Sequence, residues 1–284
     1  MPYTDSDGIE IFYEVIGEPG HPVIVLISGT GAQLVSWQPE FMHLLVAEGF
    51  RVVRFDNRDT GYSQRFGGPS DIDGGYDLPD MAGDVMRVLD HLGVPAAHVV
   101  GHSMGGIIAQ VTVLEHPHRV LSLGLLSTIP GHDPRYILHG DPVMAPPVRH
   151  SREHIVAEAL EYAAPVPGRR YQLDRDWMGW AAGEAYDRGY APEGMLRQWS
   201  ALIRATERLE LLRGVAVPTL VFHGRDDEAL HWCSAVDIAG AIDDSELQVH
   251  AGMRHHIARE LWPELVAGIV RAARRGEERT HTSR

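Results

Sequence analysis

The chain has 284 residues, 44% of them hydrophobic, so it is long enough for one large globular domain with a substantial core. Its 25 Lys and Arg residues against 39 Asp and Glu residues give a net charge of −14, which argues against nucleic acid or an anionic membrane surface as a partner. No apolar run approaches membrane-spanning length, the N-terminus lacks the features of a signal peptide and Cys233 is the only cysteine, so we expect a cytoplasmic protein without disulfides.

The first part of the chain alternates between strand and helix patterns. The partly alternating run at 9–15 predicts an edge hairpin strand, and apolar runs predict buried strands at 23–27, 50–55, 97–100 and 120–126. Helical spacing predicts helices at 38–48 and 78–92 and a further helix after residue 103. Buried strands separated by helices are typical of a parallel sheet.

Proline-rich sequence and amphipathic pieces near 151–163 and 193–212 interrupt this alternation. We interpret 131–208 as a helical cap insertion, and 1–130 with 209–284 as the two parts of the core. Beyond it we expect a strand at 219–224, a helix near 230–242, a strand at 247–250, a helix at 257–273 and a frayed tail at 274–284. The whole pattern predicts an α/β fold with one mostly parallel, doubly wound sheet.

Gly101-His102-Ser103-Met104-Gly105 fits the pattern G-x-S-x-G between a predicted strand and a predicted helix. In that context the serine lies on a tight, strained turn, and the glycines let neighbouring chain approach closely. The N-terminus of the helix directs the N–H of Met104 towards the place where an oxyanion would form. A chance match is the alternative in a chain with 30 glycines, but the strand and helix favour Ser103 as a nucleophile.

A glycine-rich loop at 28–33 follows the buried strand at 23–27. Ligands of open parallel sheets bind at this carboxyl edge. We therefore assign the N–H of Thr30 as the second oxyanion donor and Gln33 as a side-chain helper; the alternative is a plain turn from strand to helix.

A serine hydroxyl needs a base to take its proton, and a carboxylate to orient that base. Asp227 and His255 follow two successive strands late in the chain, so both belong at the same edge of the sheet as Ser103. Asp226 and His256 compete with them by position. The carboxylates of the polar turn at 56–63 are interpreted as structural, because such residues commonly pin loops.

Five ordered signals resemble the α/β-hydrolase superfamily over nearly the full length: the glycine-rich loop, the G-x-S-x-G turn, the helical insertion, H-G-x-x-D at 223–227 and G-M-x-H at 252–255. The resemblance places Asp227 and His255 on the catalytic motifs. The segments 56–61 and 252–255 are also similar to aclacinomycin methylesterase-like esterases of polyketide metabolism.

Two residues depart from the pattern of the superfamily. Ser28-Gly29 stands where many members have His-Gly, which changes the polar support of the oxyanion loop. Arg254 stands where many have glycine. Its guanidinium would lower the proton affinity of the base, or pair with an acidic substrate or a nearby carboxylate.

The resemblance implies a serine hydrolase that cleaves a small-molecule carboxylic ester or lactone through an acyl-enzyme, with Ser103, His255 and Asp227 as its triad. A serine at this position excludes dehalogenase and epoxide hydrolase chemistry, which needs a carboxylate there. Thioesterase, carbon–carbon hydrolase and cofactor-free perhydrolase activities stay open, as does a ligand-binding receptor on the same fold. We expect no cofactor, and no metal because metal-binding His and Cys patterns are absent.

Aromatic residues are dense in the predicted cap. Such side chains suit a roomy pocket for a bulky, natural-product-like substrate. We select Trp177, Trp180 and Tyr186, together with Gln33, as substrate-binding residues. The alternative is that these aromatic residues pack the cap onto the core.

Overall fold

The computed structural model describes residues 3–4, 8–140 and 143–282. Within these residues seven strands form one sheet in the order β1-β3-β2-β4-β5-β6-β7. Only β1 is antiparallel to its neighbour, which confirms the predicted α/β fold with a mostly parallel sheet. The strands are β1 Tyr13–Ile16, β2 Val23–Ile27, β3 Arg51–Phe55, β4 Ala97–His102, β5 Val120–Leu126, β6 Thr219–Gly224 and β7 Ser245–His250.

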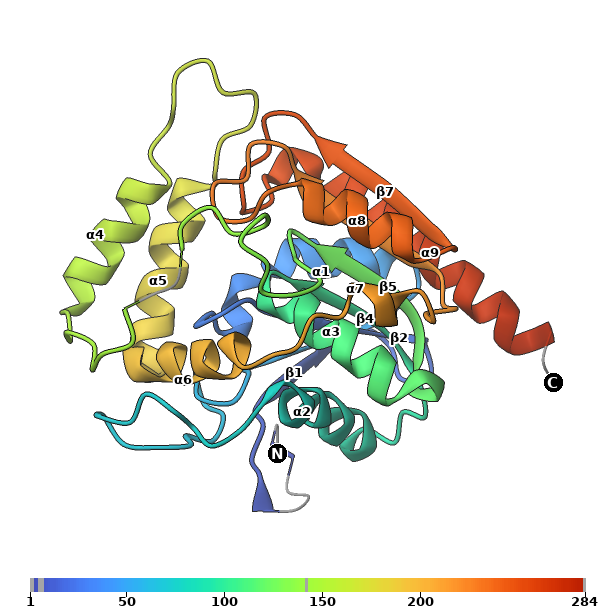
Figure 1. Cartoon of the computed structure of the whole chain (residues 1–284), viewed down its shortest axis with the longest axis horizontal. Coiled ribbons are helices and arrows are strands. Elements are labelled where there is room, and N and C mark those ends of the chain that lie inside the picture. Colours follow the sequence, from blue (N-terminus) through green and yellow to red (C-terminus); the bar gives the residue numbers. More distant parts are fainter. Residues whose placement is uncertain (1–2, 5–7, 141–142, 283–284) are drawn as a thin grey trace.

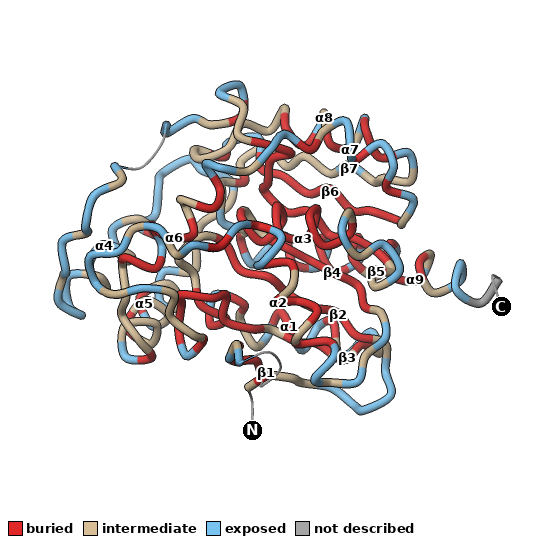
Figure 2. Tube along the Cα trace, turned by 60° about the horizontal axis from the view of Figure 1, so that its bottom comes forward, coloured by how far each residue is buried: buried red, intermediate tan, exposed pale blue. Residues whose placement is uncertain are grey.

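Helices cover both faces of the sheet (Figure 1). Successive strand residues face opposite sides, so Val25 joins one buried cluster and Leu26 the other. The Val25 side packs on α2 (Leu78–His91), α3 (Met104–Glu115) and α8 (Cys233–Ala241), and the Leu26 side on α1 (Pro39–Ala47) and α9 (Trp262–Thr282). The buried residues accordingly follow the central strands in Figure 2. No helix in the described ranges has the length and apolar character needed to cross a membrane.

Two predictions at the ends of the chain are only partly confirmed. The first strand lies at the edge of the sheet as predicted, but it begins at Tyr13 and pairs with β3, so it forms no hairpin with β2. At the other end α9 continues to Thr282, and residues 283–284 of the predicted tail lie outside the described residues. The last turns of α9 are anchored because Arg275 pairs with Asp244 at 2.7 Å and Arg274 donates to the carbonyl of Glu48.

Three helices, which we call the cap helices, lie between β5 and β6 in sequence and beside the sheet in space: α4 (Arg152–Tyr162), α5 (Arg175–Gly189) and α6 (Pro192–Ile203) (Figure 1). A short helix, α7 (Leu209–Leu212), leads back to β6. The sequence pattern did not reveal α5, because glycines face α4: a Cβ on Gly179 would lie 2.7 Å from Leu160, and one on Gly183 would lie 2.5 Å from Arg152. Close packing through small residues leaves no apolar periodicity to detect.

Buried ion pairs hold the cap helices to the loop after β3. Arg188 of α5 pairs with Asp56, and Arg197 of α6 pairs with Asp59 at 2.7 Å. Both side chains of the second pair are fully buried. Asp56 also accepts a hydrogen bond from the N–H of Leu34, 2.8 Å away. The two carboxylates therefore have the structural role expected for them.

We predict that Arg197→Met lowers the free energy of unfolding by about 3–5 kcal/mol, because it leaves the charge of Asp59 buried and unpaired. Urea unfolding followed by circular dichroism measures this change. The control is Arg213→Met, which removes an exposed pair with Glu210 and should cost less than about 1 kcal/mol. Equal losses in the two variants would contradict this role of Arg197.

A second prediction concerns His98 of β4, which is fully buried. Burial, reinforced by the charge of Arg274, lowers the pKa of His98 to about 3. In the unfolded chain histidine titrates near pH 6.5, so between these values the unfolded state binds more protons. His98 therefore makes the free energy of unfolding fall with falling pH, by about 1.4 kcal/mol per pH unit.

Urea unfolding at pH values from 6.5 down to 4 tests this linkage. His98→Gln should have a shallower slope of unfolding free energy against pH, by about 1.4 kcal/mol per pH unit. His43→Gln, on the exposed side of α1, serves as the control and should keep the wild-type slope. An unchanged slope in His98→Gln would show that His98 does not contribute to the acid sensitivity of the fold.

Candidate active site

Ser103 lies between the end of β4 and the start of α3, with a backbone φ of 56° and ψ of −121°. A non-glycine residue rarely adopts a positive φ, and surrounding contacts must hold it there. Its N–H donates to the carbonyl of Leu126, at 2.9 Å, and its carbonyl accepts from the hydroxyl of Thr128, at 2.8 Å. Strand β5 and the residues after it therefore fix the strained turn.

Glycines around Ser103 leave no room for side chains. A Cβ on Gly101 would lie 2.0 Å from the carbonyl oxygen of Gly105, and a Cβ on Gly105 would lie 2.1 Å from that of Ile27. The glycine-rich loop also passes close to the serine, because a Cβ on Gly29 would lie 3.6 Å from Ser103 Oγ. Close backbone packing therefore brings the nucleophile and the loop after β2 together, as the motif predicts.

Asp227 and His255 are in direct contact, with 2.8 Å between Asp227 Oδ2 and His255 Nδ1. Because the carboxylate accepts the hydrogen bond from Nδ1, His255 keeps Nε2 as the nitrogen that can accept a proton. The other oxygen of Asp227 accepts hydrogen bonds from the backbone N–H groups of Ala229 and Leu230. Asp226 is exposed and accepts from the backbone N–H of Gly252 instead. The geometry therefore favours Asp227 over Asp226, and of the two adjacent histidines His255 is the one that Asp227 contacts.

Asp227 stays ionised although it is buried. Burial acts to raise its pKa, but hydrogen bonds from His223 and His255 outweigh that effect and hold the pKa of Asp227 below its usual range. His223 Nε2 lies 3.2 Å from Asp227 Oδ2. His223 is not among the residues predicted for the site, although its place four residues before Asp227 in the H-G-x-x-D segment is the signal for this contact. An ionised carboxylate can stabilise an imidazolium that forms on His255.

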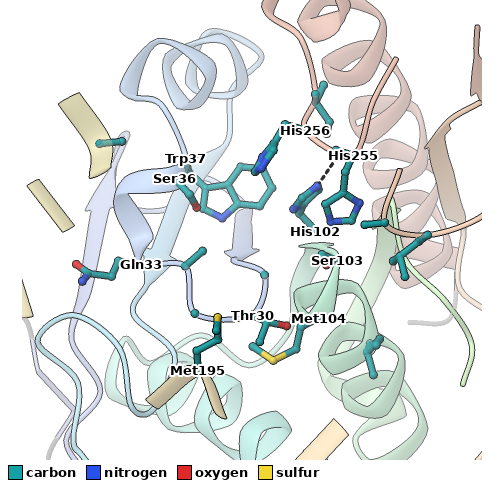
Figure 3. Close-up of a pocket in the computed structure, with 18 of the residues that line it drawn as sticks. Thr30, Gln33, Ser36, Trp37, His102, Ser103, Met104, Met195, His255 and His256 are labelled. Carbon is teal, nitrogen blue, oxygen red and sulfur yellow. Dashed lines mark hydrogen bonds between the residues drawn. The ribbon is translucent and has the colours of Figure 1, made fainter. Parts of the chain in front are cut away.

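The two assigned oxyanion donors lie beside the nucleophile. Met104 is the first residue of α3, so its N–H has no acceptor within the helix. Thr30 follows Gly29 in the loop that passes next to Ser103. Thr30, Met104 and His255 gather around Ser103 in Figure 3, and all four line one cavity.

Hydrogen bonds to residues outside it hold the loop at 28–33, which has Ser28 where many members of the superfamily have histidine. Ser28 Oγ lies 3.0 Å from Ser36 Oγ, and the carbonyl of Ser28 accepts from the side chain of Asn57 at 3.0 Å. The N–H of Gly31 donates to the side-chain oxygen of Gln198 in α6, at 2.7 Å. A cap helix therefore takes part in shaping the oxyanion loop.

His102 and Arg254 lie beside His255 and make contacts of their own. His102 Nε2 lies 2.9 Å from the carbonyl oxygen of His255, as the dashed line in Figure 3 marks. Removal from water, with the charge of nearby His255, lowers the pKa of His102 to about 3, so a neutral ring donates this bond. Arg254 pairs with Glu228 at 2.6 Å and covers the ring of Tyr162. Of the roles considered for Arg254, pairing with a nearby carboxylate is therefore the one found.

The cavity has a volume of about 630 Å³ and lies between the cap helices and the carboxyl edge of the sheet. Five residues of α5 line it: Trp177, Met178, Ala181, Ala182 and Ala185. Their spacing defines one face of the helix. Within the described residues no group of three His, Cys, Asp or Glu side chains is arranged to hold a metal ion.

Only part of the predicted substrate-binding set faces this cavity. Trp177 lines it, but Trp180 is 51% exposed and Tyr186 stacks on Tyr190, so neither belongs to the lining. Both lie off the helix face that α5 turns towards the cavity, which corrects their assignment. Gln33 is at the cavity edge but points away from Ser103 in Figure 3, and its side chain bonds to Ala185 and Arg188. Gln33 therefore joins the oxyanion loop to α5.

Comparisons with known proteins give a family and several similar proteins. A model of the α/β hydrolase fold family matches residues 22–258. The putative carbamate hydrolase RutD of Variovorax paradoxus is 29% identical over 270 residues, which cover 87% of this chain and 90% of that protein. Rhodomycin D methylesterase DnrP of Streptomyces peucetius is 38% identical over 121 residues, which cover 43% of this chain and only 40% of that protein.

Solved structures show the same fold. The enol-lactonase from Burkholderia xenovorans LB400 superposes with a TM-score of 0.67 at 23% identity, over 98% of this chain and 100% of that one. A meta-cleavage product hydrolase from Pseudomonas fluorescens IP01 superposes with a TM-score of 0.73 at 20% identity, over 95% of this chain and 96% of that one.

The glycine packing around Ser103 leads to a prediction. Gly105→Ala should lower the free energy of unfolding by about 1–3 kcal/mol and reduce any activity of Ser103, because the new methyl group displaces the serine turn. Gly240→Ala is the matched control: Gly240 lies in α8 with open space around its Cβ position. That substitution should raise the free energy of unfolding by about 0.5–1 kcal/mol. Thermal unfolding of both variants checks the prediction, and a neutral result for Gly105→Ala would refute it.

Proposed function

The chain belongs to the α/β-hydrolase fold family, and from this premise we propose that it is a serine hydrolase that cleaves a carboxylic ester or lactone through a covalent acyl-enzyme. The contact of 2.8 Å between Asp227 and His255, on the cavity that Ser103 lines, carries the proposal. It supplies what a serine needs to become a nucleophile, namely a base held in one orientation.

In the proposed cycle His255 Nε2 takes the proton of Ser103 Oγ as that oxygen attacks the acyl carbonyl carbon. Asp227 keeps Nδ1 protonated and stabilises the imidazolium. The N–H groups of Thr30 and Met104 bind the oxyanion, and each contributes about 3 kcal/mol to stabilising the transition state. His255 then gives the proton to the departing alkoxide. Water, activated by the same nitrogen, releases the acid and restores Ser103.

The cavity supports a bulky, largely apolar substrate. Its walls include aromatic and aliphatic side chains, among them Trp177, Trp199 and Ile107. Two of the similar proteins are named for related chemistry, a methylesterase and an enol-lactonase. We therefore extend the proposal to an ester or lactone of natural-product size. The triad and the free N–H of Met104 favour turnover over simple ligand binding.

The proposal is tested with p-nitrophenyl esters of increasing acyl length. Ser103→Ala and His255→Ala should each lower kcat by at least about 10⁴-fold, because nucleophile and base act as one unit. Asp227→Asn should also lose most of the activity, because the base loses its orientation. Release of p-nitrophenol measures turnover, and mass spectrometry of the quenched reaction detects the acyl group on Ser103.

Asp226→Asn is the matched control for Asp227→Asn, since it places the same change one residue away on an exposed side chain. It should keep most of the wild-type activity. Activity that survives Ser103→Ala would refute the mechanism. A wild type that is acylated once and never turns over would instead identify a ligand-binding member of the fold.

A further inference from the structure

Arg208 is a buried cation in the wall of the cavity. It follows the cap helices, directly before α7, and is 4% exposed. The same wall includes the apolar residues Ile129, Leu202 and Ala205. Burial lowers the pKa of Arg208 to about 10, opposed only by the charge of Glu207. A guanidinium in this range keeps its charge at neutral pH.

The contacts of Arg208 satisfy only part of its hydrogen-bonding capacity. Its Nε lies 3.4 Å from the side-chain oxygen of Gln110 in α3, and one terminal nitrogen donates to the carbonyl of Thr206 at 2.8 Å. No carboxylate of the described residues lies within ion-pair distance of it. Both of its hydrogen-bond partners are neutral acceptors, so the only opposing charge is that of Glu207, which is exposed and forms no ion pair with Arg208 among the described residues.

Other arginines of this chain show that such a lone charge is unusual here. Arg58, Arg188 and Arg197 are equally buried, and each has a buried aspartate: Asp84, Asp56 and Asp59. Arg259 also lines the cavity, but it pairs with Asp174 at 3.1 Å. Of the two arginines that line the cavity, Arg208 is therefore the one without an ion pair among the described residues.

We propose that Arg208 binds a carboxylate of the substrate, so that the enzyme prefers esters or lactones whose acyl part carries a second, free acid group. The proposal rests on the hydrolase function proposed above and names the substrate class of that site. Because the protein as a whole has a net charge of −14, general electrostatics would disfavour an anionic substrate. A preference for acids must therefore come from a local cation.

The position of Arg208 sets the length of such a substrate. Gln110, which Arg208 contacts, is seven residues after Ser103 along α3, a distance of about 10 Å at the rise of an α-helix. A guanidinium lies about 3 Å from the oxygens it binds, and the serine oxygen a similar distance from the carbonyl it attacks. A chain of a few methylene groups spans the distance that is left between the substrate's carbonyl carbon and its free acid group.

The test compares p-nitrophenyl monoesters of linear dicarboxylic acids, from glutarate to sebacate, with the same esters whose free acid is capped as a methyl ester. Spontaneous hydrolysis is subtracted, and the measured quantity is the ratio of kcat/KM for acid over capped ester. For the wild type we expect a ratio of about 10 to 100 at the best chain length, the value of one charge-assisted hydrogen bond. The ratio should pass through a maximum within the series.

Arg208→Gln should bring the ratio to about one, because it keeps a donor but removes the charge. Arg208→Lys should retain part of the preference. Arg213→Gln makes the same change on an exposed arginine that pairs with Glu210, and it should keep the wild-type ratio. Circular dichroism and thermal unfolding verify that each variant is folded.

The outcomes separate this inference from the proposed function. A wild type that hydrolyses acid and capped esters equally well, or an Arg208→Gln variant that keeps the preference, overturns the carboxylate site and leaves the hydrolase standing. Equal losses on both substrates in Arg208→Gln would assign the residue a structural role and also overturn the site. A wild type that hydrolyses no ester of either kind overturns both proposals.

Discussion

The backbone of Ser103 is the constraint on which the site depends. A serine keeps a φ of 56° only where surrounding contacts hold its backbone in that conformation. Here β5, α3 and the loop after β2 all contact the turn. The conformation that exposes the hydroxyl also starts α3 and frees the N–H of Met104. The strained turn and the N–H of Met104, the proposed oxyanion donor, therefore both follow from a single packing arrangement in the centre of the sheet.

The other half of the site is held by charge. The cap helices meet the core through buried ion pairs from Arg188 and Arg197, whose partners lie in the loop after β3. Such pairs gain little net stability over apolar packing, because both charges must lose water. They do fix geometry, since a buried charge tolerates only positions where its partner stays in reach. The two ion pairs therefore determine where the cap helices lie over the cavity.

Features that depend on residues close together in the sequence could be predicted from the sequence alone. Strand and helix periods predicted the sheet, and the glycines around Ser103 predicted its turn. Loops after parallel strands share an edge, which placed the segments at 226–227 and 255–256 near Ser103, and the resemblance to known motifs selected Asp227 and His255 within them. Features that depend on residues far apart in the sequence could not be predicted. One is the face of α5 that lines the cavity, which does not include Trp180 and Tyr186. Another is that Arg208 forms no ion pair within the part of the chain that the structure describes.

Gln198 has a further consequence for how this protein could diversify. Its side chain accepts from the N–H of Gly31, next to Thr30, and donates to the carbonyl of Arg58. The residue belongs to α6, so the segment that shapes the pocket also sets the loop that serves the chemistry. A cap exchanged by recombination would have to bring this amide with it, or the recipient would inherit a new specificity on a misaligned catalytic loop. In this chain the cap helices and the loop at 28–33 are therefore coupled through one side chain.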